Sequence, residues 1–183
     1  HLAAELLDNG MDEAVAGHAS WIELELTADG QLAVSDNGRG IPIDPHPKFK
    51  KKSALEVVMT TLHSGGKFDN KVYDTSGGLH GVGLSVVNAL SDRLIVEVTR
   101  DKKKWSQSYS RGAPINKLER SGAAKIKSGT KISFHPDPKI FGPGARFRPA
   151  KLFSMAQSKA YLFKGVQIRW KCDPKLILSL IHI

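Results

Sequence analysis

The first fourteen residues carry apolar side chains at every third or fourth position, namely Leu2, Leu6, Leu7, Met11 and Ala14. This spacing matches the period of an α-helix, so the segment predicts an amphipathic helix. Residues 21–27 instead alternate polar and apolar side chains, which predicts a half-buried strand. The chain therefore opens with a helix followed by a strand.

Later segments predict further strands and three more helices. The helices are expected at residues 54–63, 81–90 and 148–163, the last with Pro149 in its first turn. Helices and antiparallel hairpins without regular alternation of strand and helix predict an α+β two-layer sandwich. Strands are expected at residues 31–34, 93–99, 104–110, 130–134 and 166–170.

A glycine-rich segment leads into the helix predicted at residues 81–90. Residues 77–83 read Gly-Gly-Leu-His-Gly-Val-Gly, and four glycines in seven residues let the backbone approach a ligand closely. A loop that enters a helix N-terminus presents unpaired N–H groups, which suits phosphate. The segment matches neither the P-loop nor the dinucleotide fingerprint, and a simple connecting turn is the alternative. Residues 64–80 are long for a connector, so we expect a lid over a nucleotide.

Three polar residues share one face of the predicted first helix. Glu5, Asn9 and Asp12 are related as i, i+4 and i+7, so their side chains lie on the same side. A carboxylate and an amide one turn apart can serve one water and one metal ion, with Glu5 polarising the water and Asn9 ligating Mg²⁺. The alternative interpretation is a solvated polar face.

A second candidate group follows the strand predicted at residues 31–34. Asp36 lies at the end of that strand, where its carboxylate can accept a hydrogen bond from an exocyclic amine. Gly38 and Gly40 let the backbone lie against a flat ring. The sequence Asp-Asn-Gly is also typical of an ordinary turn, and that alternative stays open.

Together these segments resemble the GHKL ATPase superfamily and, within it, the B subunits of bacterial type IIA topoisomerases. Two segments, Asp44-Pro45-His46-Pro47 and Tyr73-Asp74-Thr75-Ser76, look more like topoisomerase IV B subunits than gyrase B subunits. The resemblance covers residues 1–171 and rests on five motifs in the family's order, namely Glu5-x-x-x-Asn9-x-x-Asp12-Glu13-Ala14, Asp36-x-Gly38-Arg39-Gly40-Ile41-Pro42, Leu62-His63-Ser64-Gly65-Gly66-Lys67-Phe68, Ser76-Gly77-Gly78-Leu79-His80-Gly81-Val82-Gly83 and Gly129-Thr130.

The resemblance implies a two-layer GHKL (Bergerat-type) sandwich over residues 1–174, with a mostly antiparallel mixed sheet and helices on one face. It also implies ATP and Mg²⁺ as cofactors. In the family, the residue matching Glu5 is the general base that activates water for attack on the γ-phosphate, and the residue matching Asn9 coordinates Mg²⁺. Asp36 would bind the adenine amino group, directly and through a water that Thr130 helps to hold.

Further residues of the nucleotide site follow from the same resemblance. Arg39 and Glu13 match the family's ion pair beside the adenine pocket, and Ile41 and Pro42 match its apolar wall. The lid and the glycine-rich loop around the triphosphate would contribute Lys67, Tyr73, Gly77, Gly78, Leu79, His80, Gly81, Val82 and Gly83.

For the whole protein the resemblance implies an ATP-hydrolysing component of a topoisomerase. ATP binding would close a dimer gate between two B subunits around double-stranded DNA, while a partner A subunit cleaves DNA. Coumarin-type inhibitors are implied as ligands, but Ser106 aligns where gyrase B subunits carry an arginine used by these inhibitors, so we expect weaker binding. The alternatives are a non-hydrolysing nucleotide-dependent dimerisation module, a DNA gyrase B subunit or another GHKL ATPase.

The two ends of the chain depart from the family pattern. The chain begins at His1, inside or at the edge of the family's first helix, so we expect the N-terminal arm to be missing and the fragment to be monomeric. It stops before the family's transducer domain, so we expect it to bind nucleotide better than it hydrolyses it. Residues 175–183 are unexpectedly apolar, and we interpret them as a native strand or an artefact, without a function.

The chain has 27 Lys and Arg against 18 Asp and Glu, a formal net charge of +9. A basic surface suits a DNA-handling enzyme, but much of the excess lies in runs at residues 48–52 and 101–104. We interpret both runs as solvated loops, the second at a hairpin tip. Cys172 is the single cysteine, so an intramolecular disulfide is impossible and a reducing cytoplasm is expected. The apolar end is too short to cross a membrane, and the seven histidines show no metal-ligand spacing.

Overall fold

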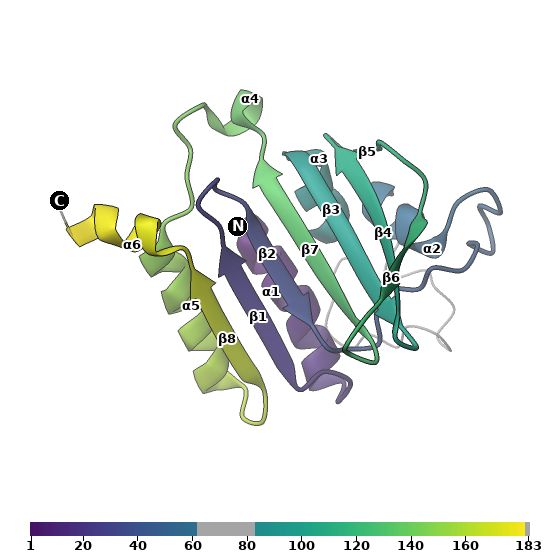
Figure 1. Cartoon of the computed structure of the whole chain (residues 1–183), viewed down its shortest axis with the longest axis horizontal. Coiled ribbons are helices and arrows are strands. Elements are labelled where there is room, and N and C mark those ends of the chain that lie inside the picture. The colour runs from purple at the N-terminus through teal and green to yellow at the C-terminus, as the bar shows by residue number, and fades with distance from the viewer. Residues whose placement is uncertain (62–82, 182–183) are drawn as a thin grey trace.

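An eight-stranded sheet with helices packed on one face forms the framework of the molecule (Figure 1). The computed structural model describes residues 1–61 and 83–181, with side chains as far as residue 177. The predicted α+β two-layer sandwich is confirmed. The helices that cover this face of the sheet are α1 (Leu2–Val15), α3 (Gly83–Ala89) and α5 (Pro149–Leu162). Helix α2 (Ala54–Thr60) packs beside α3. The short helix α4 (Pro138–Phe141) precedes α5 along the chain.

The strands run antiparallel to their neighbours except at one edge. The order across the sheet is β5-β4-β3-β7-β2-β1-β8, with β6 also paired to β4, and within the described chain only the β1–β8 pair is parallel. The strands are β1 (Trp21–Leu26), β2 (Leu32–Asp36), β3 (Ser91–Arg100), β4 (Lys103–Ser110), β5 (Ala113–Pro114), β6 (Glu119–Ala123), β7 (Gly129–Pro136) and β8 (Gln167–Cys172). Every predicted strand is present. The sequence did not predict β5 and β6, whose residues are all exposed and carry no alternating pattern.

Helix α2 is shorter than the helix predicted at residues 54–63. Ser53 caps its start, because the Ser53 side chain accepts a hydrogen bond from the Glu56 N–H at 3.1 Å. The helix ends at Thr60, since Thr61 adopts extended backbone angles. The helix predicted at residues 81–90 is confirmed from Gly83 onward, because residues 81 and 82 lie outside the described residues.

The apolar end of the chain forms a helix, α6 (Pro174–Ile181), so the expectation of a strand there is wrong. Proline is favoured in the first turn of a helix, where its missing N–H costs no hydrogen bond. Asp173 also accepts a hydrogen bond from the Lys175 N–H at 2.9 Å, which is the arrangement of an N-cap. Among the helices of the described residues, none is both long and apolar enough to cross a membrane.

The core between the two layers fixes where α1 lies. The inner face of α1 buries Leu6, Leu7 and Met11, each at most 3% exposed, and the facing side of β1 buries Ile22 and Leu24 completely. Gly10 brings the helix close to the strand, because a Cβ at this position would lie 3.3 Å from the Ile22 side chain. This packing directs the end of α1 toward the end of β2, where the candidate site lies.

Asn88 connects α3 to the end of α2. Its side-chain amide donates a hydrogen bond of 2.8 Å to the backbone oxygen of Met59. The last carbonyls of a helix have no partner within the helix, so this bond satisfies one of them. It holds α3, and with it Gly83 at the start of α3, in a defined position against α2.

The turn between β3 and β4 is a tight hairpin, as the sequence predicted for residues 101–104. Asp101 and Lys102 connect the strands, and both have positive φ values, of 51° and 61°. Two successive residues with positive φ characterise the type I′ turn, whose twist matches that of the flanking strands. The tip is therefore held by the strands that it connects.

Candidate functional site

Asp36 occupies the end of β2 and is buried, with 5% of its surface exposed. It pairs across the sheet with Thr130 of β7. The Gly38 N–H donates a hydrogen bond of 2.8 Å to Asp36 Oδ1, which closes a turn directly after the strand. The turn that the sequence offered as an alternative is therefore present, and it is the device that orients the buried carboxyl group.

Burial raises the pKa of Asp36 to about 7. The hydrogen bonds from the backbone of Gly38 and Thr130 favour the ionised form and oppose this shift, while the negative charge of Glu13 adds to it. A hydrogen-bond donor from a ligand would favour the ionised carboxylate and lower the pKa. The site thus holds a carboxyl group that gains from a bound donor.

Glu13 and Arg39 form an ion pair between the end of α1 and the loop after β2. Arg39 donates from its side chain to both carboxylate oxygens of Glu13, at 2.7 and 3.2 Å, and its backbone N–H donates at 2.9 Å. Burial alone would raise the pKa of Glu13, but these hydrogen bonds and the charge of Arg39 outweigh it, so the pKa lies below its usual value. The predicted ion pair is therefore formed.

Two glycines allow the loop after β2 to run close to its neighbours. A Cβ on Gly38 would lie 2.7 Å from a Glu13 carboxylate oxygen and 2.9 Å from Asp36 Oδ1. Gly40 has a φ of +79°, and a Cβ there would lie 2.7 Å from the backbone oxygen of Thr99. Neither position accommodates a side chain. The backbone at both positions is consequently free of side-chain bulk.

The apolar part of the site follows directly along the chain. Ile41 is 2% exposed and Pro42 is also buried. The Ile41 N–H donates a hydrogen bond of 3.2 Å to the hydroxyl oxygen of Thr130, so this threonine lies between Asp36 and the apolar wall. The structure therefore brings together the residues that the sequence predicted for a flat ring and its amine.

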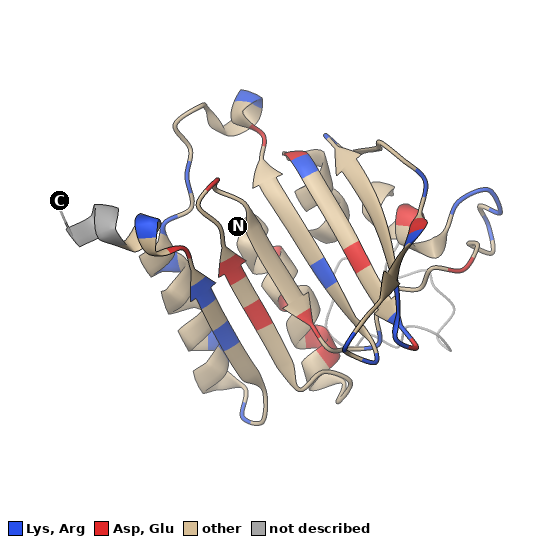
Figure 2. Ribbon diagram, viewed as in Figure 1, with Lys and Arg blue, Asp and Glu red and all other residues tan. Residues whose placement is uncertain are grey.

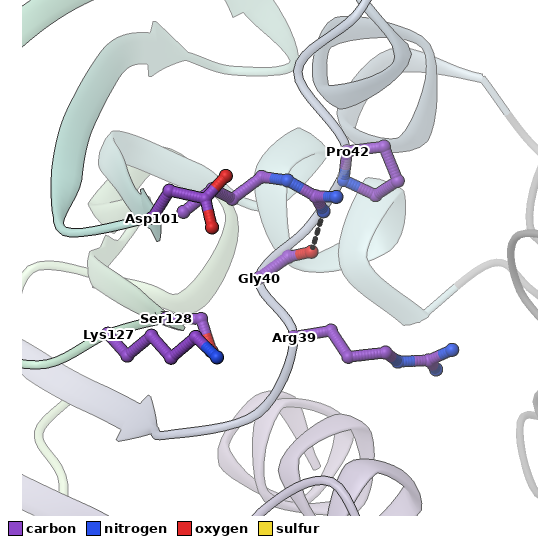
Figure 3. Close-up of a pocket in the computed structure, with 7 residues that line it drawn as sticks. Arg39, Gly40, Pro42, Asp101, Lys127 and Ser128 are labelled. Carbon is purple, nitrogen blue, oxygen red and sulfur yellow. Dashed lines mark hydrogen bonds between the residues drawn. The ribbon is translucent and has the colours of Figure 1, made fainter.

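A cavity of about 240 Å³ opens beside this loop. Arg100, at the end of β3, donates a hydrogen bond of 2.8 Å to the backbone oxygen of Gly40 across this cavity, as the dashed line in Figure 3 shows. Three cationic side chains and one carboxylate therefore surround the opening. The residues that line it are Arg39, Gly40, Pro42, Arg100, Asp101, Lys127 and Ser128.

The sequence did not identify Arg100, Lys127 and Ser128 as residues of the pocket. Ser106 lies on β4 opposite Glu97 and does not line this cavity, so its predicted alignment with an inhibitor-binding arginine stays a prediction. Arg100 brings a guanidinium group to the cavity. The signal that could have located it is the hairpin itself, since the tip at residues 101 and 102 directly follows Arg100.

Glu5 lies against the start of α3. A Cβ on Gly83 would overlap with carboxylate oxygen Oε2 of Glu5, so no side chain separates this carboxylate from the helix N-terminus. Glu5 is exposed, and Asn9, one turn further along α1, is half-buried. The predicted general base therefore lies beside the point where the glycine-rich segment enters α3.

Asp12 completes the polar face of α1 and is half-buried. Its pKa is raised to about 6 by burial and by the neighbouring charges of Asp8 and Glu13. Asp8 in turn forms an ion pair of 2.6 Å with Lys159 of α5. On this face Glu5 is exposed while Asn9 and Asp12 are half-buried, so the alternative of a solvated polar face stays open.

The remaining predicted site residues lie outside the described residues. They are Lys67, Tyr73, Gly77, Gly78, Leu79, His80, Gly81 and Val82. Their predicted roles in the lid and in the phosphate loop therefore stay predictions.

The family model "Histidine kinase-, DNA gyrase B-, and HSP90-like ATPase" matches residues 1–140. Among solved structures, the chain is similar to the crystal structure of the 43K ATPase domain of Thermus thermophilus gyrase B in complex with an aminocoumarin. The two share 43% sequence identity and a TM-score of 0.81, over 94% of this chain and 42% of the other. The fold predicted from the resemblance is therefore confirmed.

Curated relatives point to the same group of proteins. The B subunit of DNA topoisomerase 4 from Caulobacter vibrioides is 60% identical over 97% of this chain. Its counterpart from Rickettsia prowazekii is 57% identical over 94% of the chain, and the B subunit of DNA gyrase from Thermus thermophilus is 50% identical over 92%. The matches cover 25 or 26% of these relatives, so the chain spans about a quarter of their length.

The raised pKa of Asp36 predicts a pH-dependent stability. The folded chain binds a proton at Asp36 up to about pH 7, whereas the unfolded chain loses it near the ordinary value of 3.8. The free energy of unfolding should therefore fall as pH rises from 4 to 7. Asp36→Asn should remove this part of the decline, which urea denaturation between pH 4 and 8 would measure.

The matched control is Asp44→Asn, because Asp44 is exposed. Asp12 is present in all three proteins, so the difference between wild type and Asp36→Asn isolates Asp36 from the other raised carboxyl group. Parallel pH profiles for wild type and Asp36→Asn would contradict the raised pKa.

Proposed function

The chain belongs to the family of histidine kinase-, DNA gyrase B- and HSP90-like ATPases, and we propose that it binds ATP with its adenine at Asp36 and hydrolyses it with Glu5 as general base. ATP binding itself follows from membership of this ATPase family. Family membership does not specify which residues of this chain hold the adenine and the attacking water.

The observation that carries the proposal is the buried carboxyl group of Asp36 beside a loop free of side-chain bulk. Asp36 already accepts a hydrogen bond from the Gly38 N–H, and a carboxylate has acceptor capacity for a further donor, which the exocyclic amine of adenine supplies. Gly38 and Gly40 leave the backbone bare, while Ile41 and Pro42 supply an apolar wall. This combination suits a flat base that carries an amino group.

Glu5 is suited to act on the water that attacks the γ-phosphate. As general base it would accept a proton from that water while the bond between the γ-phosphorus and the β,γ-bridging oxygen breaks, with ADP and phosphate as products. Its carboxylate lies beside Gly83, where the glycine-rich segment enters α3. In phosphoryl transfer the protein mainly positions groups and neutralises charge, so one base and a loop rich in N–H donors suffice.

Asn9 is the residue that would hold Mg²⁺. Its amide oxygen is the kind of hard ligand that Mg²⁺ prefers, and Mg²⁺ commonly takes one or two protein ligands together with substrate phosphates. Among the described residues no three His, Cys, Asp or Glu side chains form a metal-binding group, which fits a metal held largely by the nucleotide. When bound, Mg²⁺ would neutralise charge on the phosphates.

For the residues outside the described part of the chain the proposal follows the family motifs. Lys67 and Tyr73 would reach the nucleotide from a lid, and the backbone from Gly77 to Gly83 would wrap the triphosphate. Backbone N–H groups at a helix N-terminus favour such an anion.

We infer that the whole protein is a topoisomerase IV B subunit. The relatives that are B subunits of DNA topoisomerase 4 are 56–60% identical, against 50% for the B subunit of a DNA gyrase. Two copies of the whole protein would then form an ATP-operated gate for double-stranded DNA, and a separate A subunit would cleave DNA. A gyrase B subunit is the alternative.

The ATP site is tested by calorimetry with the Mg²⁺ complex of ATP. Asp36→Ala should bind at least about tenfold more weakly than wild type, because the lost hydrogen bond is worth about 1.5–3 kcal/mol. Asp44→Ala removes an exposed aspartate and should bind like wild type. Equal affinity of Asp36→Ala and wild type would reject the adenine position.

Hydrolysis is tested separately with Glu5→Gln. This change keeps the size of the side chain but removes the base, so slow release of phosphate should fall about 100-fold or more. ATP affinity should stay within about threefold of wild type, since Glu5 acts on water rather than on the base or ribose. A wild-type chain that binds ATP and releases no phosphate would favour the non-hydrolysing dimerisation module.

We also propose that aminocoumarins bind in the cavity lined by Arg39 and Arg100. The gyrase B ATPase domain from Thermus thermophilus to which the chain is similar was solved in complex with an aminocoumarin, and Arg100 holds a guanidinium group at the cavity of this chain. Arg100→Ala should weaken binding about tenfold or more, whereas Ser106→Ala should leave it unchanged. An effect of Ser106→Ala alone, measured by calorimetry, would instead support an inhibitor position at Ser106.

A further inference from the structure

We propose that one end of the sheet binds the phosphate backbone of duplex DNA. This surface, here called the basic end, consists of Lys102, Lys103, Arg120, Lys125 and Lys127. The inference rests on the proposed topoisomerase function, since it assigns the DNA of that function to a surface of this domain.

Two segments that are separate in the sequence form the basic end. The Lys102 N–H donates to the Lys127 oxygen at 2.9 Å, and the Ala124 N–H donates to the Lys102 oxygen at 2.9 Å. Strand pairing places Lys103 opposite Ala123 and Trp105 opposite Arg120. Figure 2 shows the blue Lys and Arg positions gathered at the lower tips of these hairpins. The sequence reading of residues 101–104 as an isolated solvated loop is therefore incomplete.

The side chains of the basic end are not engaged within the described molecule. In that part of the chain none of the five makes a hydrogen bond or an ion pair through its side chain. Three other lysines do form ion pairs, namely Lys104 with Glu97 at 3.6 Å, Lys159 with Asp8 at 2.6 Å and Lys171 with Glu23 at 3.1 Å. The basic end therefore offers cations that no carboxylate neutralises.

The charge at this end is concentrated. Residues 100–104 and 119–127 contain seven Lys or Arg against two Asp or Glu, which is more than half of the formal net charge of +9. Like charges this close repel one another and oppose folding, and a polyanion removes that repulsion. The backbone hydrogen bonds between the two segments keep the cations together on a fixed scaffold.

The chemistry of these segments favours duplex over single-stranded DNA. Neither segment contains Phe, Trp, Tyr or His, and Trp105, which follows the first segment and pairs opposite Arg120, is half-buried. One half-buried ring does not provide the series of aromatic platforms on which successive unpaired bases stack. Contacts from lysine to phosphate carry no sequence information, so binding should be independent of sequence and strongly weakened by salt.

The test uses this chain and a fluorescently labelled duplex of about 20 base pairs, with anisotropy measured at several salt concentrations. The variant K102E/K103E/K125E reverses three charges of the basic end and spares every residue that lines the cavity beside Gly40 and every residue proposed to bind ATP. The control K151E/K164E/K175E reverses three exposed lysines of α5, the turn after α5 and α6, and changes the net charge equally.

The basic-end variant should bind the duplex at least about 30-fold more weakly, and the slope of log K against log salt should fall by about 3, since each phosphate contact contributes about 0.9. The control should change affinity less than about threefold. Both variants should bind ATP like wild type. Equal losses in both variants, or no duplex binding by a wild-type chain that still binds ATP, would overturn the inference and leave the ATP site standing.

Discussion

The ion pair between Glu13 and Arg39 joins the helical layer to the loop that follows β2, and the site depends on it. Glu13 is 5% exposed, so its charge survives burial only with a partner that meets both oxygens. Breaking a fully buried pair costs about 3–5 kcal/mol, and less where one partner, like the 28%-exposed Arg39 side chain, still reaches water. The ion pair fixes the position of the loop relative to α1. Gly38 allows the loop to come this close to Glu13, because it has no side chain.

Sequence reasoning succeeded where local pattern and tertiary structure agree. Alternation in β1 matches the burial of Ile22, Leu24 and Leu26 on one face, and Glu13 pairs with Arg39 as the resemblance implied. The sequence did not predict β6, because every residue of this strand is exposed and only its pairing with β4 defines it. It also did not identify Arg100 as a pocket residue, because Arg100 meets Gly40 across sixty positions of sequence and that contact has no local signal.

Two kinds of charge arrangement coexist in this small molecule. Lys104 of the sheet forms an ion pair of 3.6 Å with Glu97, and Arg39 at the cavity forms one with Glu13. Within the described residues the side chains of the basic end have no such partner, and Lys127 belongs to both the basic end and the cavity lining. A nucleotide and a nucleic acid are both phosphate compounds, and the two proposed sites present positive groups on neighbouring loops.

The glycines of the loop after β2 limit how this site can evolve. Any side chain at Gly38 would collide with Glu13 and Asp36, and one at Gly40 would meet the backbone of Thr99 in a conformation that other residues avoid. These two glycine positions therefore do not tolerate substitution. Lys127 and Asp101 at the rim of the pocket are exposed and carry no such constraint. Heritable resistance to an inhibitor of this pocket should therefore arise at the rim, where substitutions leave the backbone at Gly38 and Gly40 intact.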